Sequence, residues 1–414
     1  MTAPPQNVPR ASVARTAGAA LFLLTTLNLF NFIDRYILPG VQPLVQKEFH
    51  VNDGQIGLLT TAFFFTYMIA APITGWLGDR YPRKPLIVIG ALLWSVATLY
   101  TAKVHSYETL LIRHAIVGIG EATFSIFAPA LLSDFYPEAD RNRVLSIFYV
   151  TIPVGGALGY LTGGVLGQHY GWRMPFFIAA LPGVLIALGF YFFVREPERG
   201  SADKLAPTLN RATFWGLFSN GAFLTATFGL AMWTFAVGGI STWLPTFFVR
   251  FAAMSVAKAG TVAGAITVLC GLLGTVIGGW AGQLWMQRNH RGLYLLSAWG
   301  SVLAIPFVAL VLLGPAPLMM PAAFLAEIFL FLGTGPLNAA IVNSVAAPVR
   351  ATAISLNLFI IHALGDAFSP HLIGKLSDVT NLRIGLSMTL VALALSGIIL
   401  FTGARFAPLL QEKG

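Results

Sequence analysis

One helical stretch of this chain carries charged side chains where residues facing lipid would be expected. The stretch is Asn28–Arg35, within an apolar run from about 17 to 38 that is long enough to cross a bilayer as a helix. Its polar residues recur every three to four positions and so share one helix face. A charge at the middle of such a helix costs roughly 2.5–3.5 kcal/mol on insertion scales. We therefore expect Asp34 and Arg35 to face the protein interior as functional residues, or else to belong to a polar cluster that only joins helices.

A second intramembrane carboxylate, Glu121, lies in a later apolar run. His114 is seven residues earlier, about 20° from the same helix face, and Arg113 is about 80° away. Burial favours the neutral form of a carboxyl group, whereas a nearby cation favours the charged form. We expect Asp34 to face these three side chains. Proton binding at Asp34 would then release a cation, either Arg113 or His114, to hold an anionic group.

The second half of the chain carries polar stripes on two further apolar runs. Glu327 and Asn338 align on one run, and His362 and Asp366 lie four residues apart on the next. We predict that these four residues line a cavity in the second half. The alternative is that they form structural hydrogen bonds between helices.

The composition indicates which elements position these residues. The chain is 56% hydrophobic and only 10% charged, whereas a soluble domain carries about 25% charged residues. Its apolar runs continue over about 20 residues, which favours helices over the alternating strands of a barrel. We predict an all-α polytopic membrane protein with twelve transmembrane helices in two pseudo-symmetric bundles of six. The predicted parts are a cytoplasmic tail 1–16, a first bundle 17–194, a cytoplasmic linker 195–212, a second bundle 213–405 and a cytoplasmic tail 406–414.

The distribution of basic residues predicts the orientation. Sixteen of the 25 Lys and Arg residues fall in the tails and in alternate loops on one side, and six fall on the other side. The positive-inside rule then places both termini in the cytoplasm of a multi-pass protein of the cell (inner) membrane. This asymmetry accounts for the net charge of +9 without a nucleic-acid partner.

The two halves resemble each other at a nearly constant offset, which indicates a duplication. The landmarks are Gly75-Trp-Leu-Gly-Asp79 and Gly279-Trp-Ala-Gly-Gln283 (offset 204), Arg143 and Arg350 (offset 207), and Pro39 and Pro245 (offset 206). Two such halves with a site between them at mid-membrane are typical of an alternating-access transporter.

The loop after the second run, Gly75-Trp-Leu-Gly-Asp79-Arg80-Tyr-Pro-Arg83-Lys84, resembles the signature of the major facilitator superfamily. The resemblance implies a cytoplasmic gate made by these residues. The alternative for the three basic residues is that they only set topology. The second copy has Gln283 in place of the acid, so any ionic latch there should be weaker.

Four further stretches resemble the Spinster-like transporters of that superfamily. They are Asn31-Phe-Ile-Asp34-Arg35-Tyr, Val117-Gly-Ile-Gly-Glu121-Ala, Phe331-Leu-Gly-Thr-Gly-Pro336-Leu-Asn338-Ala and Ile361-His362-Ala-Leu-Gly365-Asp366-Ala-Phe-Ser369-Pro370. The resemblance implies a proton-linked carrier of lysophospholipids or sphingolipid phosphates, with Asp34 and Glu121 as key charges. The family pattern places Arg where this chain has His114, so either Arg113 or His114 takes that role.

Other functions remain open from the sequence. The chain could be a proton-coupled exporter of drugs, a carrier of organic anions, or an uncoupled lipid scramblase or sensor. An enzyme is the weakest reading, because no apolar run carries a metal-ligand cluster or a nucleophile motif. We expect a monomer without metal or cofactor, whose partners are a small amphiphilic substrate, protons and membrane lipids.

Overall fold

The computed structural model describes residues 10–197, 215–345 and 350–408, and all of its regular elements are helices. Twelve of them are long and apolar enough to cross a membrane, which confirms the predicted number of spans. The helices are α1 (Arg10–Phe49), α2 (Asp53–Arg80), α3 (Arg83–Tyr100), α4 (Tyr107–Phe135), α5 (Glu138–Tyr149), α6 (Thr151–Tyr170), α7 (Met174–Phe193), α9 (Gly221–Phe251), α10 (Val256–Arg288), α11 (Gly292–Leu313), α12 (Ala316–Leu332), α13 (Thr334–Asn343), α14 (Arg350–Ile361), a π-helical turn (His362–Asp366), α15 (Ser369–Val379) and α16 (Leu382–Gly403).

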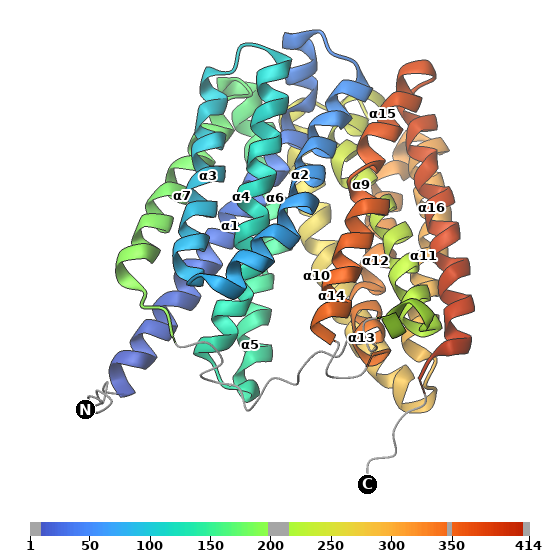
Figure 1. The fold of residues 1–414 in the computed structure, drawn as a ribbon. Coiled ribbons are helices and arrows are strands. Elements are labelled where there is room, and N and C mark those ends of the chain that lie inside the picture. Colours follow the sequence, from blue (N-terminus) through green and yellow to red (C-terminus); the bar gives the residue numbers. More distant parts are fainter. Residues whose placement is uncertain (1–9, 198–214, 346–349, 409–414) are drawn as a thin grey trace, which may run out of the picture.

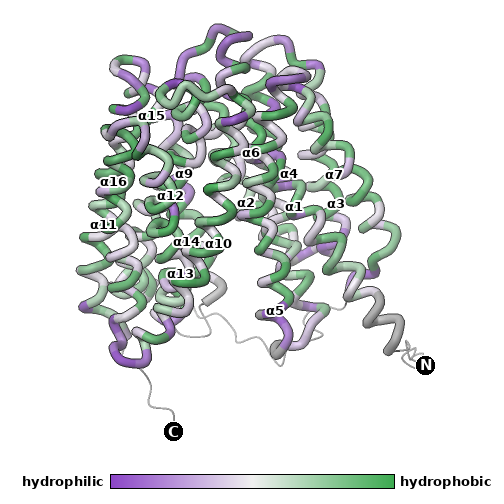
Figure 2. The backbone as a smooth tube through the Cα atoms, turned by 180° about the vertical axis from the view of Figure 1, so that it is seen from behind, coloured by the Kyte–Doolittle hydropathy of each residue, from purple (hydrophilic) through white to green (hydrophobic). Residues whose placement is uncertain are grey.

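The helices form two bundles, α1–α7 and α9–α16, called here the N-half and the C-half. Helix α1 begins and α16 ends at the same end of the molecule, here called the tail end (Figure 1). The two bundles meet at the opposite end and separate toward the tail end (Figure 1). Hydrophilic segments gather at the two ends, and hydrophobic segments run between them (Figure 2).

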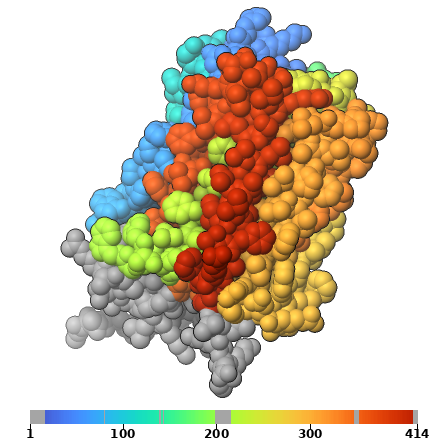
Figure 3. Space-filling view, turned by 90° about the vertical axis from the view of Figure 1, so that its right-hand side faces the viewer, coloured from blue at the N-terminus to red at the C-terminus, as the bar shows by residue number. Residues whose placement is uncertain are grey.

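The buried cores follow this shape. One apolar core includes Val41, Trp243 and Phe247 and so continues from the N-half into the C-half. Two separate cores fill the bundles nearer the tail end, one around Trp94 in the N-half and one around Tyr294 in the C-half. The space-filling view shows blue N-half segments against red C-half segments at the upper, opposite end (Figure 3). Among the described residues, the shared core thus joins the halves at the opposite end.

Small residues allow this seal. A Cβ atom on Gly57 of α2 would lie 2.3 Å from the carbonyl oxygen of Pro370. A Cβ atom on Gly260 of α10 would lie 2.4 Å from the carbonyl oxygen of Tyr160 in α6. Close backbone approach at small residues is a common way of packing membrane helices. The pairs α2–α15 and α6–α10 thus join the halves.

Two predicted spans of the C-half are interrupted helices rather than continuous ones. The apolar run that carries Glu327 and Asn338 breaks at Gly333, between α12 and α13. The run that carries His362 and Asp366 contains the π-helical turn, in which Gly365 has non-helical dihedral angles (φ −104°, ψ −108°). A Cβ atom on Gly365 would lie 3.0 Å from the carbonyl oxygen of Ala231 in α9. Glycine therefore permits both the irregular backbone and the close packing against α9.

The predicted domain limits differ in detail from the helix limits. Helix α1 already begins at Arg10, within the predicted tail 1–16, and α9 begins at Gly221, eight residues after the predicted start of the second bundle at 213. The predicted linker 195–212 lies mostly outside the described residues, as does most of the tail 406–414. The division into these parts stays a prediction.

Candidate functional site

Two ion pairs connect α1 to α4 in the interior of the N-half. Arg113 donates from Nη2 to Asp34 Oδ1 at 3.2 Å. Arg35 donates to Glu121 Oε2 from Nη2 at 2.6 Å and from Nε at 3.1 Å. Each helix thus supplies one acid and one base, and each acid pairs with the base of the other helix. We call these two ion pairs the crossed pairs.

Thr98 of α3 completes the first pair. Its hydroxyl donates to Asp34 Oδ2 at 2.5 Å and accepts from Arg113 Nη2 at 2.7 Å. Arg113 is only 3% exposed, its Nε donates to the carbonyl oxygen of Ala97, and its guanidinium lies 4.8 Å from the ring centre of Phe176. The Asp34–Arg113 pair is therefore enclosed on every side.

His114 is a neutral supporting residue in this arrangement. Its Nε2 lies 3.2 Å from Arg113 Nη1, and its Nδ1 lies 2.9 Å from the carbonyl oxygen of Leu110. An arginine can only donate, so Nε2 must accept and the proton must reside on Nδ1. Arg113, rather than His114, is thus the cation that meets Asp34.

Arg35 is the more accessible of the two arginines. Its side chain is 19% exposed, and its guanidinium carbon lies between 4.8 and 5.9 Å from the ring centres of Phe32, Phe63, Phe64 and Tyr67. Its partner Glu121 is fully buried, and the second carboxylate oxygen, Oε1, has no hydrogen-bond partner among the described protein atoms. Loss of the charge on Glu121 would leave Arg35 in an aromatic cage with one face toward water.

The two asparagines on the same face of α1 differ in their contacts. Asn28 donates to the hydroxyl of Thr151 at 2.7 Å and so links α1 to α6. Asn31 is fully buried, and neither of its side-chain amide atoms has a partner among the described protein atoms.

The four candidates of the C-half do not share one cavity, contrary to our expectation. His362 Nδ1 lies 2.8 Å from Asp366 Oδ1, and the His362 ring stacks on Phe64 of the N-half with centroids 5.5 Å apart. Glu327 is buried and lines a separate, apolar cavity of about 30 Å³ within the C-half. Asn338 is exposed and donates to the carbonyl oxygen of Thr334 on its own helix. The break at Gly333 and the π-helical turn change the helix faces that a regular helix would align.

A larger cavity of about 650 Å³ lies between α2 and α14. Tyr67 and His362 line its inner part, and Gly75 and Trp76 line it nearer the tail end. Tyr67 also contacts Arg35, so the cavity reaches the neighbourhood of the Arg35–Glu121 pair. Its volume is in the range of small-molecule sites.

The predicted gate residues at the tail end contact other parts of the N-half. Arg83 forms an ion pair with Asp134 of α4, Arg80 stacks on Trp76 at 4.0 Å, and Lys84 lies 4.8 Å from the ring centre of Tyr191. The Cβ of an alanine at 75 would meet no atom within 4 Å, so Gly75 is not a site of close helix approach, whereas Gly78 packs against Phe127. The side chain of Asp79 lies outside the described residues.

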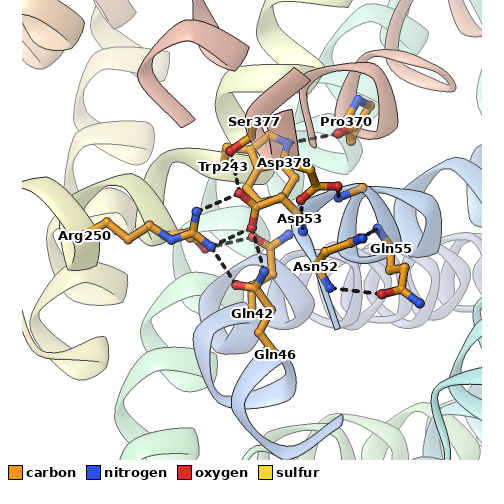
Figure 4. A network of polar contacts seen from close by, with 12 residues as sticks. Gln42, Gln46, Asn52, Asp53, Gln55, Trp243, Arg250, Pro370, Ser377 and Asp378 are labelled. Atoms are coloured by element: carbon orange, nitrogen blue, oxygen red, sulfur yellow. Dashed lines mark hydrogen bonds and ion pairs between the residues drawn. The ribbon is translucent and has the colours of Figure 1, made fainter. Parts of the chain in front are cut away.

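A second polar network closes the opposite end, and the sequence analysis missed it. Asp53 at the start of α2 accepts hydrogen bonds from Arg250 at 2.6 and 2.7 Å, from Gln46 at 2.6 Å and from Ser377 at 2.5 Å (Figure 4). Asp378 accepts from the backbone N–H groups of Asp53 and Gly54 at 2.8 and 2.9 Å. One acidic residue from each half thus anchors α2 to α9 and α15.

The comparisons with known proteins place this geometry in a family. The model of the Major Facilitator Superfamily matches residues 24–370. The chain is 34% identical over 391 residues to the sphingosine-1-phosphate transporter SPNS2 of Danio rerio, over 88% of this chain and 77% of the relative. It is 33% identical over 401 residues to protein spinster homolog 1 of Homo sapiens, over 90% and 75%. The chain belongs to the Spinster family of the major facilitator superfamily.

The structure of this Spinster-family transporter matches a solved relative. A bacterial homologue of the human lysosomal transporter Spinster, in an inward-facing and unoccupied conformation, superposes with a TM-score of 0.85. The two chains are 23% identical, and the match covers 97% of this chain and 98% of the other. This likeness confirms the predicted twelve-helix fold in two bundles. The family is one of secondary transporters, so the expectation that the chain is no enzyme is also confirmed.

Thr98 and Asp53 are the site residues that sequence reasoning overlooked in this Spinster-family transporter. Thr98 lies in an apolar run and carries no charge, so only its position opposite Asp34 marks it. Asp53 and Arg250 lie at helix ends, where charged residues are ordinary. A signal was present nonetheless, because the 204 residues between Gln46 and Arg250 are close to the offsets of 204 to 207 between the two halves.

Proposed function

We propose that this chain carries a single-chain anionic or zwitterionic lipid, such as a lysophospholipid or a sphingolipid-like molecule, by proton-coupled alternating access. The observation that carries the proposal is the crossed pairing, in which a buried carboxylate neutralises Arg35, the more exposed of the two arginines, whose guanidinium lies beside Tyr67 of the cavity lining. The relatives that are sphingosine-1-phosphate transporters support a substrate with an anionic headgroup and an apolar chain. The cavity of about 650 Å³ is lined mainly by apolar side chains of α2 and α14.

In the proposed mechanism, the exchange of charge occurs at Arg35 and Glu121. Protonation of Glu121 removes the negative charge that holds Arg35, and Arg35 then binds the anionic headgroup beside the rings of Phe63 and Tyr67. We had expected this release at Asp34. Because the partner of Asp34 is enclosed, we assign Asp34 to proton binding and Arg35 to the substrate.

We also propose that the tail end faces the cytoplasm of the cell membrane, as the excess of basic residues on that side predicts. The structure then has its halves sealed on the outer side and separated on the cytoplasmic side.

The test is uptake into proteoliposomes, with and without an imposed pH gradient. Labelled lysophosphatidylcholine and sphingosine-1-phosphate are the probes, and the native protein is compared with Asp34→Asn and Glu121→Gln. We expect gradient-dependent uptake that both variants lose. Glu48→Gln is the matched control, because Glu48 also pairs with an arginine, Arg173, but at the opposite end of the N-half.

Two results would change the assignment. Uptake that is independent of the pH gradient and equal in the native protein and both variants would indicate an uncoupled facilitator or scramblase. An absence of lipid uptake, together with gradient-driven movement of a drug or an organic anion, would indicate the alternative substrate classes.

A further inference from the structure

A small cavity lies between the two ion pairs. It measures about 30 Å³, and its polar lining comes from Asp34, Arg35, Thr60, Arg113, His114 and Glu121. A cavity needs about 10–15 Å³ by this measure to hold a water molecule, and the water needs two to four polar partners. The cavity is therefore large enough and polar enough for one water.

The hydrogen-bonding capacity of Glu121 points to the same occupant. Both donors of Arg35 go to Oε2, and Oε1 is buried without a partner among the described protein atoms. A buried carboxylate oxygen requires a donor, because unpaired polar atoms are costly in an interior of low dielectric. The donor must be small, since Phe63 and Val117 close the rest of the cavity.

The cavity also lies between the carboxyl groups of Asp34 and Glu121. Asp34 receives its hydrogen bonds from Thr98 and Arg113, and Glu121 receives its bonds from Arg35. No hydrogen bond joins the two carboxyl groups, although both line the cavity. Any proton that passes between them must cross this space.

We propose that the cavity binds one water molecule and that this water carries a proton between Glu121 and Asp34. In the step, protonated Glu121 gives the proton on Oε1 to the water, while the water gives one of its own protons to the carboxylate of Asp34. The water is regenerated, Glu121 regains the charge that pairs with Arg35, and Asp34 loses the charge that pairs with Arg113. The relay rests on the proposed proton coupling, whereas the water site does not.

The experiment uses one variant that fills the cavity and one that removes a polar partner. Val117→Ile adds a methylene group to the lining, and Thr60→Val removes a hydroxyl at almost constant volume. Val96→Ile is the matched control, because it adds the same group at a residue of α3 that is 55% exposed. Thr60→Val keeps the test valid if Val117→Ile does not fold.

The first measurement is a pH-induced infrared difference spectrum of the full chain in lipid nanodiscs, recorded in ordinary water and in H₂¹⁸O. We expect a water O–H band that shifts with the oxygen isotope in the native protein and in Val96→Ile, and that is lost in Val117→Ile and altered in Thr60→Val. A band unchanged in both cavity variants, or no such band in the native protein, overturns the water site. This reading does not depend on transport.

The second measurement compares proton-driven lipid uptake with lipid counterflow at equal pH on both sides. We expect Val117→Ile to lose at least tenfold in proton-driven uptake while it keeps counterflow within about twofold of Val96→Ile. Native proton-driven uptake in a variant that has lost the band overturns the relay. If lipid uptake by the native protein did not depend on the pH gradient, the proposed function would be refuted instead. The infrared result would still decide whether the water binds.

Discussion

Gln46 and Arg250 are 204 residues apart in the sequence and 3.0 Å apart in the structure. Gln42 and Thr246 have the same separation in sequence and are joined at 2.9 Å. Because the repeated landmarks of the two halves have offsets of 204 to 207, these pairs join nearly equivalent positions of α1 and α9. They therefore lie beside the pseudo-symmetry axis, where α1 meets α9, and any opening of the opposite end must separate them.

Loss of the Arg250 guanidinium should favour opening at that end. In Arg250→Gln, Asp53 loses both ionic hydrogen bonds from the C-half, although Ser377 still donates to it. Because Arg250 is about one-third exposed, solvent weakens the pair, and we expect a severalfold rather than a larger shift in population. Distances between spin labels at the exposed residues Lys47 and Lys258 would measure it.

Arg173→Gln is the control for that experiment. Arg173 pairs with Glu48 at the same end, but within the N-half. An equal shift in both variants would show that surface charge, not the contact between halves, controls the equilibrium.

A methyl group at Gly57 should prevent full closure of the opposite end. The added Cβ would lie 2.3 Å from the carbonyl oxygen of Pro370, which belongs to the backbone and cannot move alone. Gly57→Ala should therefore separate α2 from α15 and increase labelling of cysteines placed in that interface. In Gly279→Ala the same methyl group would meet no atom within 4 Å, so labelling should match the native protein.

Removal of the Thr98 hydroxyl should change the pH dependence of transport. The hydroxyl donates to the Asp34 carboxylate and so favours its charged form. In Thr98→Val, Asp34 should accept a proton at higher pH, and the pH of half-maximal proton-driven uptake should move upward. Thr98→Ser keeps the donor and should stay near the native value. A downward shift in Thr98→Val would contradict the assigned direction of this hydrogen bond.

His114 should matter as an acceptor rather than as a titrating group. His114→Leu leaves Arg113 Nη1 without its acceptor, and we expect a loss of about 1–3 kcal/mol in the free energy of unfolding. Thermal unfolding in detergent would measure the loss. His114→Gln can still offer a carbonyl oxygen and should recover much of the stability. If His114→Gln were as unstable as His114→Leu, the ring itself would be the stabilising feature.

The sequence predicted the spans, the duplication and most members of the charge cluster, but it did not predict the pairing. Successive residues of a helix point about 100° apart, so Asp34 and Arg35 leave α1 in different directions. Arg113 and Glu121 are eight residues apart, about 12 Å along α4. Only the position of α1 against α4 decides which acid meets which base, and that position comes from packing between distant segments.

The irregular helices were beyond prediction for a related reason. A glycine within an apolar run does not by itself break a helix, and Gly118 lies within regular α4. At Gly333 and Gly365 a Cβ atom would lie 3.2 and 2.9 Å from the nearest atom of a neighbouring helix, so the two breaks occur where helices pack closely. Asn338 and Glu327 are eleven residues apart, about 16 Å along a helix, so alignment on one face does not bring them together.

The crossed pairs also have an electrical consequence. Asp34 and Glu121 contribute two negative charges, Arg35 and Arg113 contribute two positive ones, and the tautomer of His114 contributes none. The cluster is thus neutral as a whole. For the monoanionic substrates among those proposed, one bound proton and one headgroup would return the cluster to neutrality. The empty cluster and the loaded cluster would then carry the same net charge, so we expect the transmembrane voltage to act little on either of them.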